Sequence, residues 1–336
     1  MTNDPQTSCA PSASSHTDAD ADFELTISAR EHVADGVLAL TLGRRDGQSL
    51  PSWEPGAHID LVCSDTLIRQ YSLCGDPADR FCWHIAVLLE PQGRGGSRLV
   101  HEKLLEGQTV RVRGPRNHFR LDPAGRYTFI AGGIGITPLF PMIASVSAAG
   151  ADWSLTYGGR HRGSMAFVDS LLDRYGDRVT VYPQDEFGHI DLDALLGTGG
   201  RIPADELVYC CGPSPLLTAV EQRVAADSVD RLRIERFEPA EEVRRDTDQP
   251  FEIEVASTGQ VLTVPASESV LETLARNGYK VEASCKEGTC GTCETGVLGG
   301  EVDHRDSVLT AVEREANELM MICVSRAACS RLVLDL

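Results

Sequence analysis

Four cysteines near the end of the chain restrict its fold more than any other feature. Cys285, Cys290 and Cys293 follow the spacing C-x4-C-x2-C, and 29 residues separate Cys293 from Cys323. Three thiols on one short loop with a fourth from a distant segment form the ligand pattern of a 2Fe–2S cluster. The last part of the chain must therefore fold around a loop that presents three thiolates to one centre.

The residues around these cysteines suit a cluster loop. Gly288 and Gly291 stand where the backbone must wrap closely around sulfur atoms that accept several N–H hydrogen bonds. A structural zinc site is the alternative, but zinc ligands usually come as two separated C-x2-C pairs. Cys329 could compete with Cys323 as the fourth ligand, and we expect it to be a spare thiol.

Length and composition limit the remaining possibilities. A chain of 336 residues, 42% of them hydrophobic, has room for two or three domains. It contains no run of about 18 apolar residues, so we expect no transmembrane helix. Residues 1–22 carry four acids but no Lys, Arg or apolar signal segment, which predicts a disordered acidic tail and a cytoplasmic protein. In that reducing compartment, the eleven cysteines would serve metal binding or redox chemistry rather than a disulfide scaffold.

The charge distribution narrows the classes of partner. A net charge of −19 argues against a basic nucleic-acid surface and against a polybasic membrane patch, so we expect neither partner. Residues 250–336 hold 7 basic and 14 acidic side chains, a net charge of −7. Residues 23–122 are nearly neutral and contain arginines that suit an anionic ligand, namely Arg69, Arg94, Arg98, Arg111, Arg113, Arg116 and Arg120.

Hydrophobic periodicity divides the chain into three folded units. Short alternating apolar runs recur over residues 23–122, with one helix expected at 97–105, which predicts an antiparallel β-barrel. Residues 123–237 alternate apolar strands with helices, which predicts a parallel α/β domain. A polar linker is expected at 238–249, and a small domain at 250–336 begins with a hairpin and ends with a strand.

Two motifs in the predicted barrel suit anion binding. Residues 69–73 place a guanidinium, a planar and permanent cation, beside two hydroxyl groups; they include Arg69, Tyr71, Ser72 and Leu73. A glycine-rich run leads into the one expected helix, where backbone N–H groups can bind an anion; it consists of Gly93, Arg94, Gly95, Gly96 and Ser97. The alternatives are surface residues on a strand and a flexible hairpin loop.

Further motifs follow the strands of the predicted α/β domain. A loop after the first strand suits close approach of the backbone to a pyrophosphate, although its spacing is not G-x-G-x-x-G; it includes Gly132, Gly133, Gly135, Thr137 and Pro138. Cys211, Gly212 and Pro213 end a later strand. Arg160, after the second strand, is followed by two more basic residues and would favour a ribose 2′-phosphate.

The order of these motifs resembles the phthalate dioxygenase reductase family, from about Phe23 to Leu336. Residues 320–327 and 332–336 are similar to the end of those reductases, and residues 69–72 resemble the R-x-Y-S signature of ferredoxin-reductase-like flavin barrels. The resemblance implies a flavin-binding β-barrel, a nicotinamide-binding α/β domain and a C-terminal plant-type ferredoxin domain with the β-grasp fold. It also implies that the flavin is held by residues 93–97 together with Arg69, Tyr71, Ser72 and Leu73, with the R-G-G-S form favouring FMN over FAD.

The resemblance assigns the remaining candidate residues. It implies that the loop at 132–138, Arg160, Gly212 and Pro213 bind NADH, in conflict with the phosphate preference read from Arg160 itself. It implies that three candidate catalytic residues lie beside the nicotinamide or the flavin, namely Cys211, Glu235 and Phe237. The metal ligands are the four cysteines named at the outset.

These implications describe an NADH-dependent reductase that passes electrons through FMN and a 2Fe–2S cluster to a separate Rieske-type terminal oxygenase or demethylase. The acidic third domain predicts a basic docking patch on that partner. One alternative is a reductase for a haem monooxygenase, or a general ferredoxin-type electron donor. An alternative of another class is a non-catalytic electron carrier or redox sensor without flavin.

Overall fold

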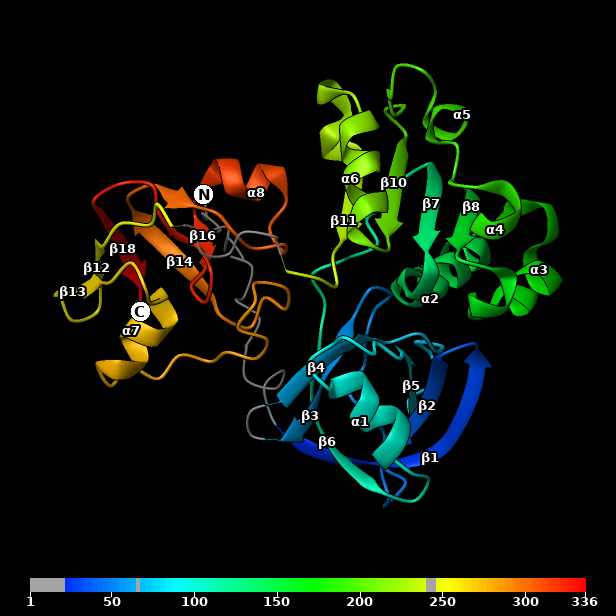
Figure 1. Cartoon of the computed structure of the whole chain (residues 1–336), viewed down its shortest axis with the longest axis horizontal. Helices are drawn as coiled ribbons and strands as arrows, with labels where there is room; N and C mark the ends of the chain where they lie inside the picture. The colour runs from blue at the N-terminus through cyan, green and yellow to red at the C-terminus, as the bar shows by residue number, and fades with distance from the viewer. Residues whose placement is uncertain (1–21, 65–66, 240–245) are drawn as a thin grey trace, which may run out of the picture.

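Three sheets, one after another along the chain, organise the computed structural model (Figure 1). The structure describes residues 22–64, 67–239 and 246–336. Apart from Asp22, the predicted tail lies outside the described residues, and so does the middle of the predicted linker, residues 240–245. In the part of the chain that is described, every helix is too short or too polar to span a bilayer.

The first sheet is antiparallel and has six strands in the order β4-β3-β6-β1-β2-β5. Its strands are β1 (Phe23–Ala34), β2 (Val37–Gly43), β3 (His58–Ser64), β4 (Leu67–Ser72), β5 (Cys82–Leu88) and β6 (Thr109–Arg116). A bridge between Leu73 and Ile85 joins the two edges and closes the sheet, which confirms the predicted barrel. Helix α1 (Gly96–Lys103) is the predicted helix. The sequence analysis did not identify β3, because His58 and Asp60 interrupt its apolar run although both are buried.

The second sheet is parallel, as predicted, with the order β11-β10-β7-β8-β9. Its strands are β7 (Arg126–Gly132), β8 (Asp152–Gly159), β9 (Val179–Pro183), β10 (Glu206–Cys211) and β11 (Leu232–Glu235). The connecting helices are α2 (Ile136–Ala148), α3 (Val168–Tyr175), α4 (Gln184–Phe187), α5 (Leu192–Leu196) and α6 (Ser214–Arg223), with 3-10 turns η1 (Gly133–Gly135), η2 (Arg162–Ser164), η3 (Gly176–Arg178) and η4 (Ala226–Arg231). The strand order reverses between β7 and β10, and crevices at such points bind ligands in open α/β sheets.

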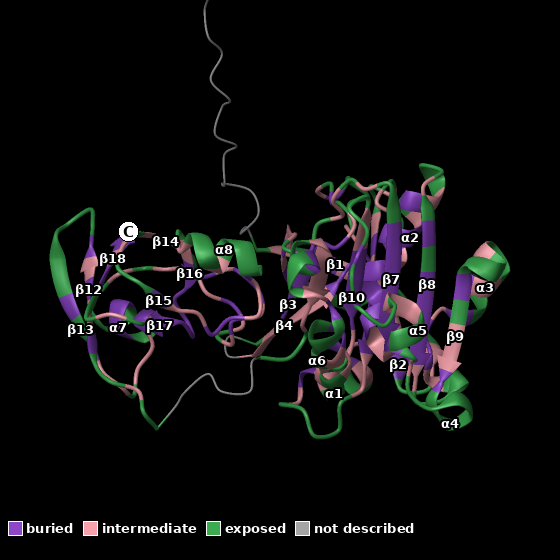
Figure 2. Cartoon of the chain, turned by 90° about the horizontal axis from the view of Figure 1, so that it is seen from above, coloured by how far each residue is buried: buried purple, intermediate pink, exposed green. Residues whose placement is uncertain are grey.

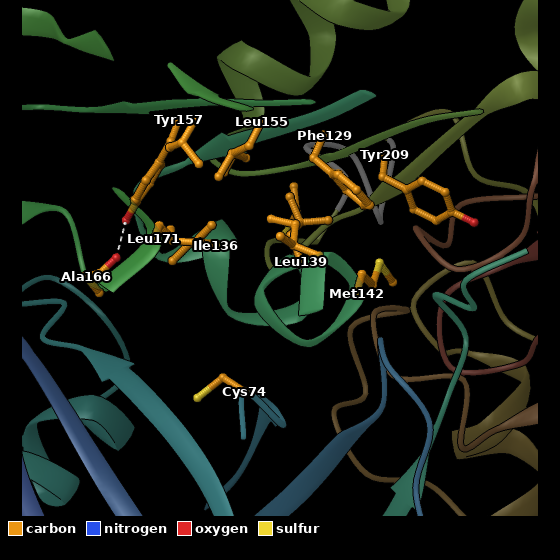
Figure 3. Close-up of a cluster of buried hydrophobic side chains, with 14 of the residues drawn as sticks. Cys74, Phe129, Ile136, Leu139, Met142, Leu155, Tyr157, Ala166, Leu171 and Tyr209 are labelled. Atoms are coloured by element: carbon orange, nitrogen blue, oxygen red, sulfur yellow. Dashed lines mark hydrogen bonds between the residues drawn. The ribbon is translucent and has the colours of Figure 1, made fainter. Parts of the chain in front are cut away.

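The barrel and the parallel sheet share one hydrophobic core. Cys74 and Ala86 of the barrel belong to the same buried cluster as Phe129, Leu139 and Tyr157 of the α/β unit. Figure 3 shows Cys74 on the barrel side of α2, and Figure 2 shows β7 and β8 buried along most of their length. Burial of this apolar surface fixes the first two sheets against each other.

The third sheet is mixed, with the order β13-β12-β18-β14-β16 and a parallel pair β12–β18 at its centre. Its strands are β12 (Phe251–Val255), β13 (Gln260–Val264), β14 (Glu294–Gly299), β16 (Leu319–Met321) and β18 (Arg331–Asp335); β15 (Val302–Asp303) and β17 (Arg326–Ala327) form a separate ribbon. The helices are α7 (Val270–Arg276) and α8 (Ala311–Ala316). In α7 the Ser269 hydroxyl accepts from Glu272 N–H and the Glu272 carboxylate accepts from Ser269 N–H, a capping box that sets where the helix begins.

The end of the predicted linker is anchored on this third sheet. Asp248 accepts hydrogen bonds from Arg305 at 2.6 and 2.9 Å and lies 3.8 Å from Arg326, and all three side chains are buried. A buried carboxylate needs such partners, so these ion pairs fix where the chain enters the third sheet.

Candidate functional site

The four predicted ligand thiols lie together, three on the loop that precedes β14 and the fourth just after β16. The Cys285 sulfur contacts the sulfurs of Cys290 and Cys323, and Cys323 also contacts Cys293. Zinc ligands usually come as two separated C-x2-C pairs, so the spacing of these cysteines favours a 2Fe–2S cluster over a structural zinc site. These contacts join all four thiols into one group, so each iron of a binuclear cluster could take its cysteine ligands from it.

Backbone donors support a thiolate in this loop. The N–H groups of Glu287 and Thr289 donate to Cys285 Sγ over 3.3 and 3.4 Å. The adjacent thiols of Cys290 and Cys323 hold the pKa of Cys285 well below its usual range, and these N–H donors add to the shift. Cys329 instead lies at the β17–β18 turn, where its sulfur accepts from Glu301 N–H at 3.2 Å.

Both loop glycines are required by geometry. Gly288 and Gly291 have φ of +70° and +73°, in the left-handed region that favours glycine. A Cβ on Gly288 would lie 2.6 Å from the Val324 side chain. A Cβ on Gly291 would meet the imidazole of His118, with Cδ2 at 2.8 Å and two ring atoms nearer still. His118 follows β6, so the barrel packs directly on the cluster loop.

Two barrel motifs meet where the flavin phosphate is expected. The Arg69 side chain lies against Gly96 at the start of α1, where a Cβ would be 2.6 Å from Arg69 Cγ. Gly95, the residue before α1, has φ of +89°, and no side chain caps the helix. Arg69 Nη2 is buried without a hydrogen-bond partner among the described residues. An unpaired guanidinium nitrogen beside an uncapped helix N-terminus fits a phosphate group.

Other predicted flavin residues have structural partners. The Ser97 hydroxyl accepts from Glu90 N–H at 3.0 Å, which closes the loop that contains Gly93. Leu73 is fully buried in the barrel core, so its side chain supports the strand. Arg94 extends away from the barrel and forms an ion pair with Glu287 of the cluster loop.

Two of the three candidate catalytic residues, Cys211 and Glu235, meet where β4 faces the ends of β10 and β11. The Ser72 hydroxyl donates to the Glu235 carboxylate, and the Cys211 thiol points at Glu235 Oε2 from 3.9 Å. Burial raises the pKa of Glu235 to about 8, while Cys211 and Ser72 oppose the shift by donating hydrogen bonds. Burial also raises the pKa of Cys211 well above its usual range. At neutral pH both groups keep their protons, so this buried site is uncharged and can hold a proton. Phe237 lies after β11 and is 42% exposed.

The nucleotide-loop glycines pack against the end of β10. A Cβ on Gly132 would lie 2.7 Å from Pro213 Cδ, and one on Gly135 would lie 2.6 Å from Gly212 N. Gly133 has φ of +52° with open space beside it, and no side chain caps α2. The loop therefore offers free space and uncapped N–H groups, as a pyrophosphate requires.

The rest of the predicted nucleotide site consists of supporting and exposed residues. Thr137 is buried and its hydroxyl donates to Ile134 O at 2.9 Å, while Pro138 lies buried in the first turn of α2. Arg160 is exposed at the end of β8. Its neighbour Arg162 forms an ion pair with Asp169 at 2.7 Å, which neutralises part of the positive charge there.

The sequence analysis missed three residues that contact the cluster loop or lie beside it. Asp60 is fully buried, and Gln70 links it to Ser284, the residue before the first cysteine ligand. His58 is also buried, and desolvation together with the nearby Arg116 guanidinium lowers its pKa to about 3. No motif contains these residues, except that Gln70 fills the variable position of R-x-Y-S.

Comparison with known proteins agrees with this geometry. Residues 253–328 match the 2Fe-2S iron-sulfur cluster binding domain family. The chain is 41% identical over 320 residues to the putative toluene-4-sulfonate monooxygenase system reductase subunit TsaB2 of Comamonas testosteroni, covering 94% of this chain and 99% of that one. It is 40% identical to a vanillate O-demethylase oxidoreductase of a Pseudomonas species, covering 94% and 100%. The solved phthalate dioxygenase reductase is 33% identical, with a TM-score of 0.67 and coverage of 94% and 98%. The chain belongs to the phthalate dioxygenase reductase family.

Membership confirms the predicted fold and chemistry at the level of the family. The protein is an oxidoreductase with a flavin barrel, a nicotinamide-binding α/β unit and a plant-type ferredoxin unit, and its cofactors are FMN, a 2Fe–2S cluster and NADH. The predicted function, a reductase of an oxygenase system, agrees with these relatives. An intact type IV self-sufficient cytochrome P450 monooxygenase is also similar, at 44% identity and a TM-score of 0.86, and the chain spans 41% of that longer protein.

Proposed function

We propose that the chain is the reductase component of a multicomponent oxygenase system. It would take electrons from NADH and deliver them through FMN and the 2Fe–2S cluster to a separate Rieske-type terminal oxygenase or demethylase. We divide it into an FMN-binding barrel (23–122), an NAD-binding domain (123–237), a linker (238–249) and a ferredoxin domain (250–336), with a cytoplasmic location. The location is supported by the described cysteines, which form no disulfide.

One observation carries the proposal: β4 contacts both neighbouring sites. Ser72 at its end reaches Glu235 and, through it, Cys211, which we propose lies beside the nicotinamide. Gln70, two residues earlier, reaches Ser284 beside the first cluster ligand. A flavin held by this strand would lie between the electron donor and the exit, which is the arrangement that a chain of electron transfers needs.

The cofactors supply the redox chemistry, since flavin accepts a hydride and returns single electrons while the cluster carries one at a time. The chain's own residues hold and orient these groups. Arg69 and the start of α1 would bind the flavin phosphate, Gly132 to Gly135 the nucleotide pyrophosphate, and the four cysteines the irons. Glu235 and Cys211 remain protonated at neutral pH and keep negative charge away from the flavin ring.

The partner should carry a basic docking patch, because the ferredoxin domain has a net charge of −7. Attraction between opposite charges weakens as salt shortens the Debye length, from about 10 Å at about 0.1 M to about 3 Å at about 1 M. The rate of electron delivery to the oxygenase should therefore fall steeply over that range, while NADH-dependent ferricyanide reduction changes little. Equal rates of delivery at both salt concentrations would refute charge-guided docking.

A haem monooxygenase is the second candidate acceptor, favoured by the similarity to the self-sufficient cytochrome P450. The reductase and NADH would be mixed anaerobically with a purified Rieske oxygenase or a purified cytochrome P450, and reduction of each metal centre followed spectroscopically. We expect rapid reduction of the Rieske centre. Faster reduction of the haem, read from its carbon monoxide difference spectrum, would assign the chain to haem enzymes instead.

A further inference from the structure

Gln70 occupies a special place on the flavin-binding strand. On a β-strand, side chains alternate between the two faces, so Gln70 points away from Arg69 and Tyr71. Arg69 lies against Gly96 at the start of α1, whereas Gln70 contacts Ser284 in the ferredoxin domain. The strand that carries the flavin signature on one face therefore meets the cluster loop on the other.

A buried carboxylate orients the Gln70 amide. Asp60 stands directly opposite Gln70 in the β3–β4 pairing and has no exposed surface. Its Oδ2 lies 2.6 Å from Arg116 Nη2, and its Oδ1 accepts from Gln70 Nε2 at 2.8 Å. Turning the amide over would set the Gln70 carbonyl oxygen against the carboxylate, so the nitrogen must face Asp60.

The second N–H of the same nitrogen makes the interdomain contact. Gln70 Nε2 lies 2.9 Å from Ser284 Oγ, and Ser284 is 8% exposed. Ser284 directly precedes Cys285, the first cluster ligand. The series Arg116–Asp60–Gln70–Ser284 thus connects the interior of the barrel to the base of the cluster loop.

The other barrel contacts to this loop are less directional. The Arg94–Glu287 ion pair is exposed on the arginine side, and such pairs contribute little to stability. The His118 ring packs closely on the backbone of Gly291, a contact set by shape alone. Beside these contacts lies a pocket of about 350 Å³, lined by Arg113 on the barrel side and Glu282 on the loop side. Among these contacts, the hydrogen bond from the Gln70 side-chain amide to Ser284 is the one that fixes both the position and the orientation of the cluster loop on the barrel.

We propose that Gln70 is a positioning residue that holds the cluster loop at a fixed place on the flavin barrel through Asp60 and Ser284. This inference rests on the proposed function, because the position matters only if electrons pass from flavin to cluster. Its amide nitrogen donates to Asp60 and to Ser284. It acts by setting the gap that electrons must cross.

The test compares two outputs of the intact holoprotein with NADH as donor. Ferricyanide reports electrons that leave the flavin, and cytochrome c reports electrons that leave the cluster. Ser284→Ala removes the interdomain bond and leaves Gln70 paired with Asp60, so it should fold normally. Gln70→Met removes the hydrogen bonds to both Asp60 and Ser284 with little change in side-chain shape. Gln222→Met, at an exposed position of α6, is the matched control.

We expect Ser284→Ala and Gln70→Met to lower cytochrome c reduction about fivefold, the effect of losing one hydrogen bond from the docked state. Ferricyanide reduction, FMN content and iron content should stay at wild-type values. Hydrogen exchange of the amides in residues 284–292 should become faster in both variants, and the double variant should be no worse than Gln70→Met alone.

Three results would overturn the proposal: an unchanged cytochrome c rate in both variants, an equal loss of ferricyanide reduction, or a loss of iron. The second would assign Gln70 to flavin binding, and the third would assign Ser284 to holding the cluster itself. A wild-type protein that reduces neither acceptor would instead refute the proposed function.

Discussion

The glycine loop of the nucleotide site offers a clean steric test. Gly135 has φ of −61° and ψ of −6°, a conformation that alanine adopts without strain. A Cβ there would nevertheless lie 2.6 Å from Gly212 N and closer still to the Cys211 carbonyl, whereas real Cβ atoms essentially never approach within 3.0 Å. Both neighbours are backbone atoms, so Gly135→Ala must push the nucleotide loop away from the end of β10.

Forcing an extra methyl group into such a contact costs about 1–3 kcal/mol of folding free energy. The same displacement would spoil the geometry of hydride transfer, where a misplacement of about 1 Å can cost about 10²-fold in rate. We therefore expect Gly135→Ala to lower the kcat/KM for NADH by one to two orders of magnitude, about 10- to 100-fold. Its unfolding transition should move to lower temperature.

The assay is NADH-dependent ferricyanide reduction, which does not require the cluster, together with thermal unfolding followed by flavin fluorescence. Gly199→Ala is the matched control, because Gly199 is exposed, has no atom within 4 Å of its Cβ position and does not need a positive φ. If Gly135→Ala and Gly199→Ala gave the same kcat/KM and the same unfolding temperature, the assignment of this loop to the nucleotide would be wrong.

Three further predictions concern the other sites. Cys293→Ser should remove the cluster absorbance and leave ferricyanide reduction intact; loss of both would contradict independent flavin chemistry. Arg69→Ala should weaken FMN binding about 10- to 100-fold, by fluorescence titration against the exposed control Arg45→Ala, and full FMN retention would exclude a phosphate contact. Burial raises the pKa of Glu235 from 4.5 to about 8. The folded protein thus holds a proton that the unfolded chain releases, and stability should fall as pH rises between these values, by up to about 1.4 kcal/mol per pH unit more steeply than in Glu235→Gln. Equal pH slopes would refute the raised pKa.

The features that could be predicted are those whose residues lie close together in the sequence. The cysteine spacing identified four thiols that the structure brings together, because three of them stand on one loop. The Arg69 and Gly96 motifs were each weak alone, and only the fold shows their direct contact. The hairpin predicted at the start of the third unit is β12 and β13, and the alternation of apolar and polar residues in Phe251–Val255 made it recognisable.

Long-range contacts and irregular elements could not be predicted. Burial raises the pKa of Glu235, and its hydrogen-bond partners Ser72 and Cys211, which oppose that shift, come from other strands that only the fold brings beside it. Arg94 stood in the predicted flavin loop, yet its guanidinium pairs with Glu287 in another domain. Strands β15 and β17 have two residues each and β16 has three, too few to show a period, so no strand was predicted there.

The central claim is that one chain holds a flavin and an iron–sulfur cluster on either side of β4. Its most direct test is anaerobic purification followed by analysis of FMN, iron and acid-labile sulfide, with rapid mixing of NADH and separate detection of flavin and cluster absorbance. We predict that the protein contains FMN, and that its iron and acid-labile sulfide contents equal each other. After mixing with NADH, the flavin band should bleach before the cluster band. A protein that contains zinc without sulfide, or a cluster reduced by NADH without any flavin, would contradict the account.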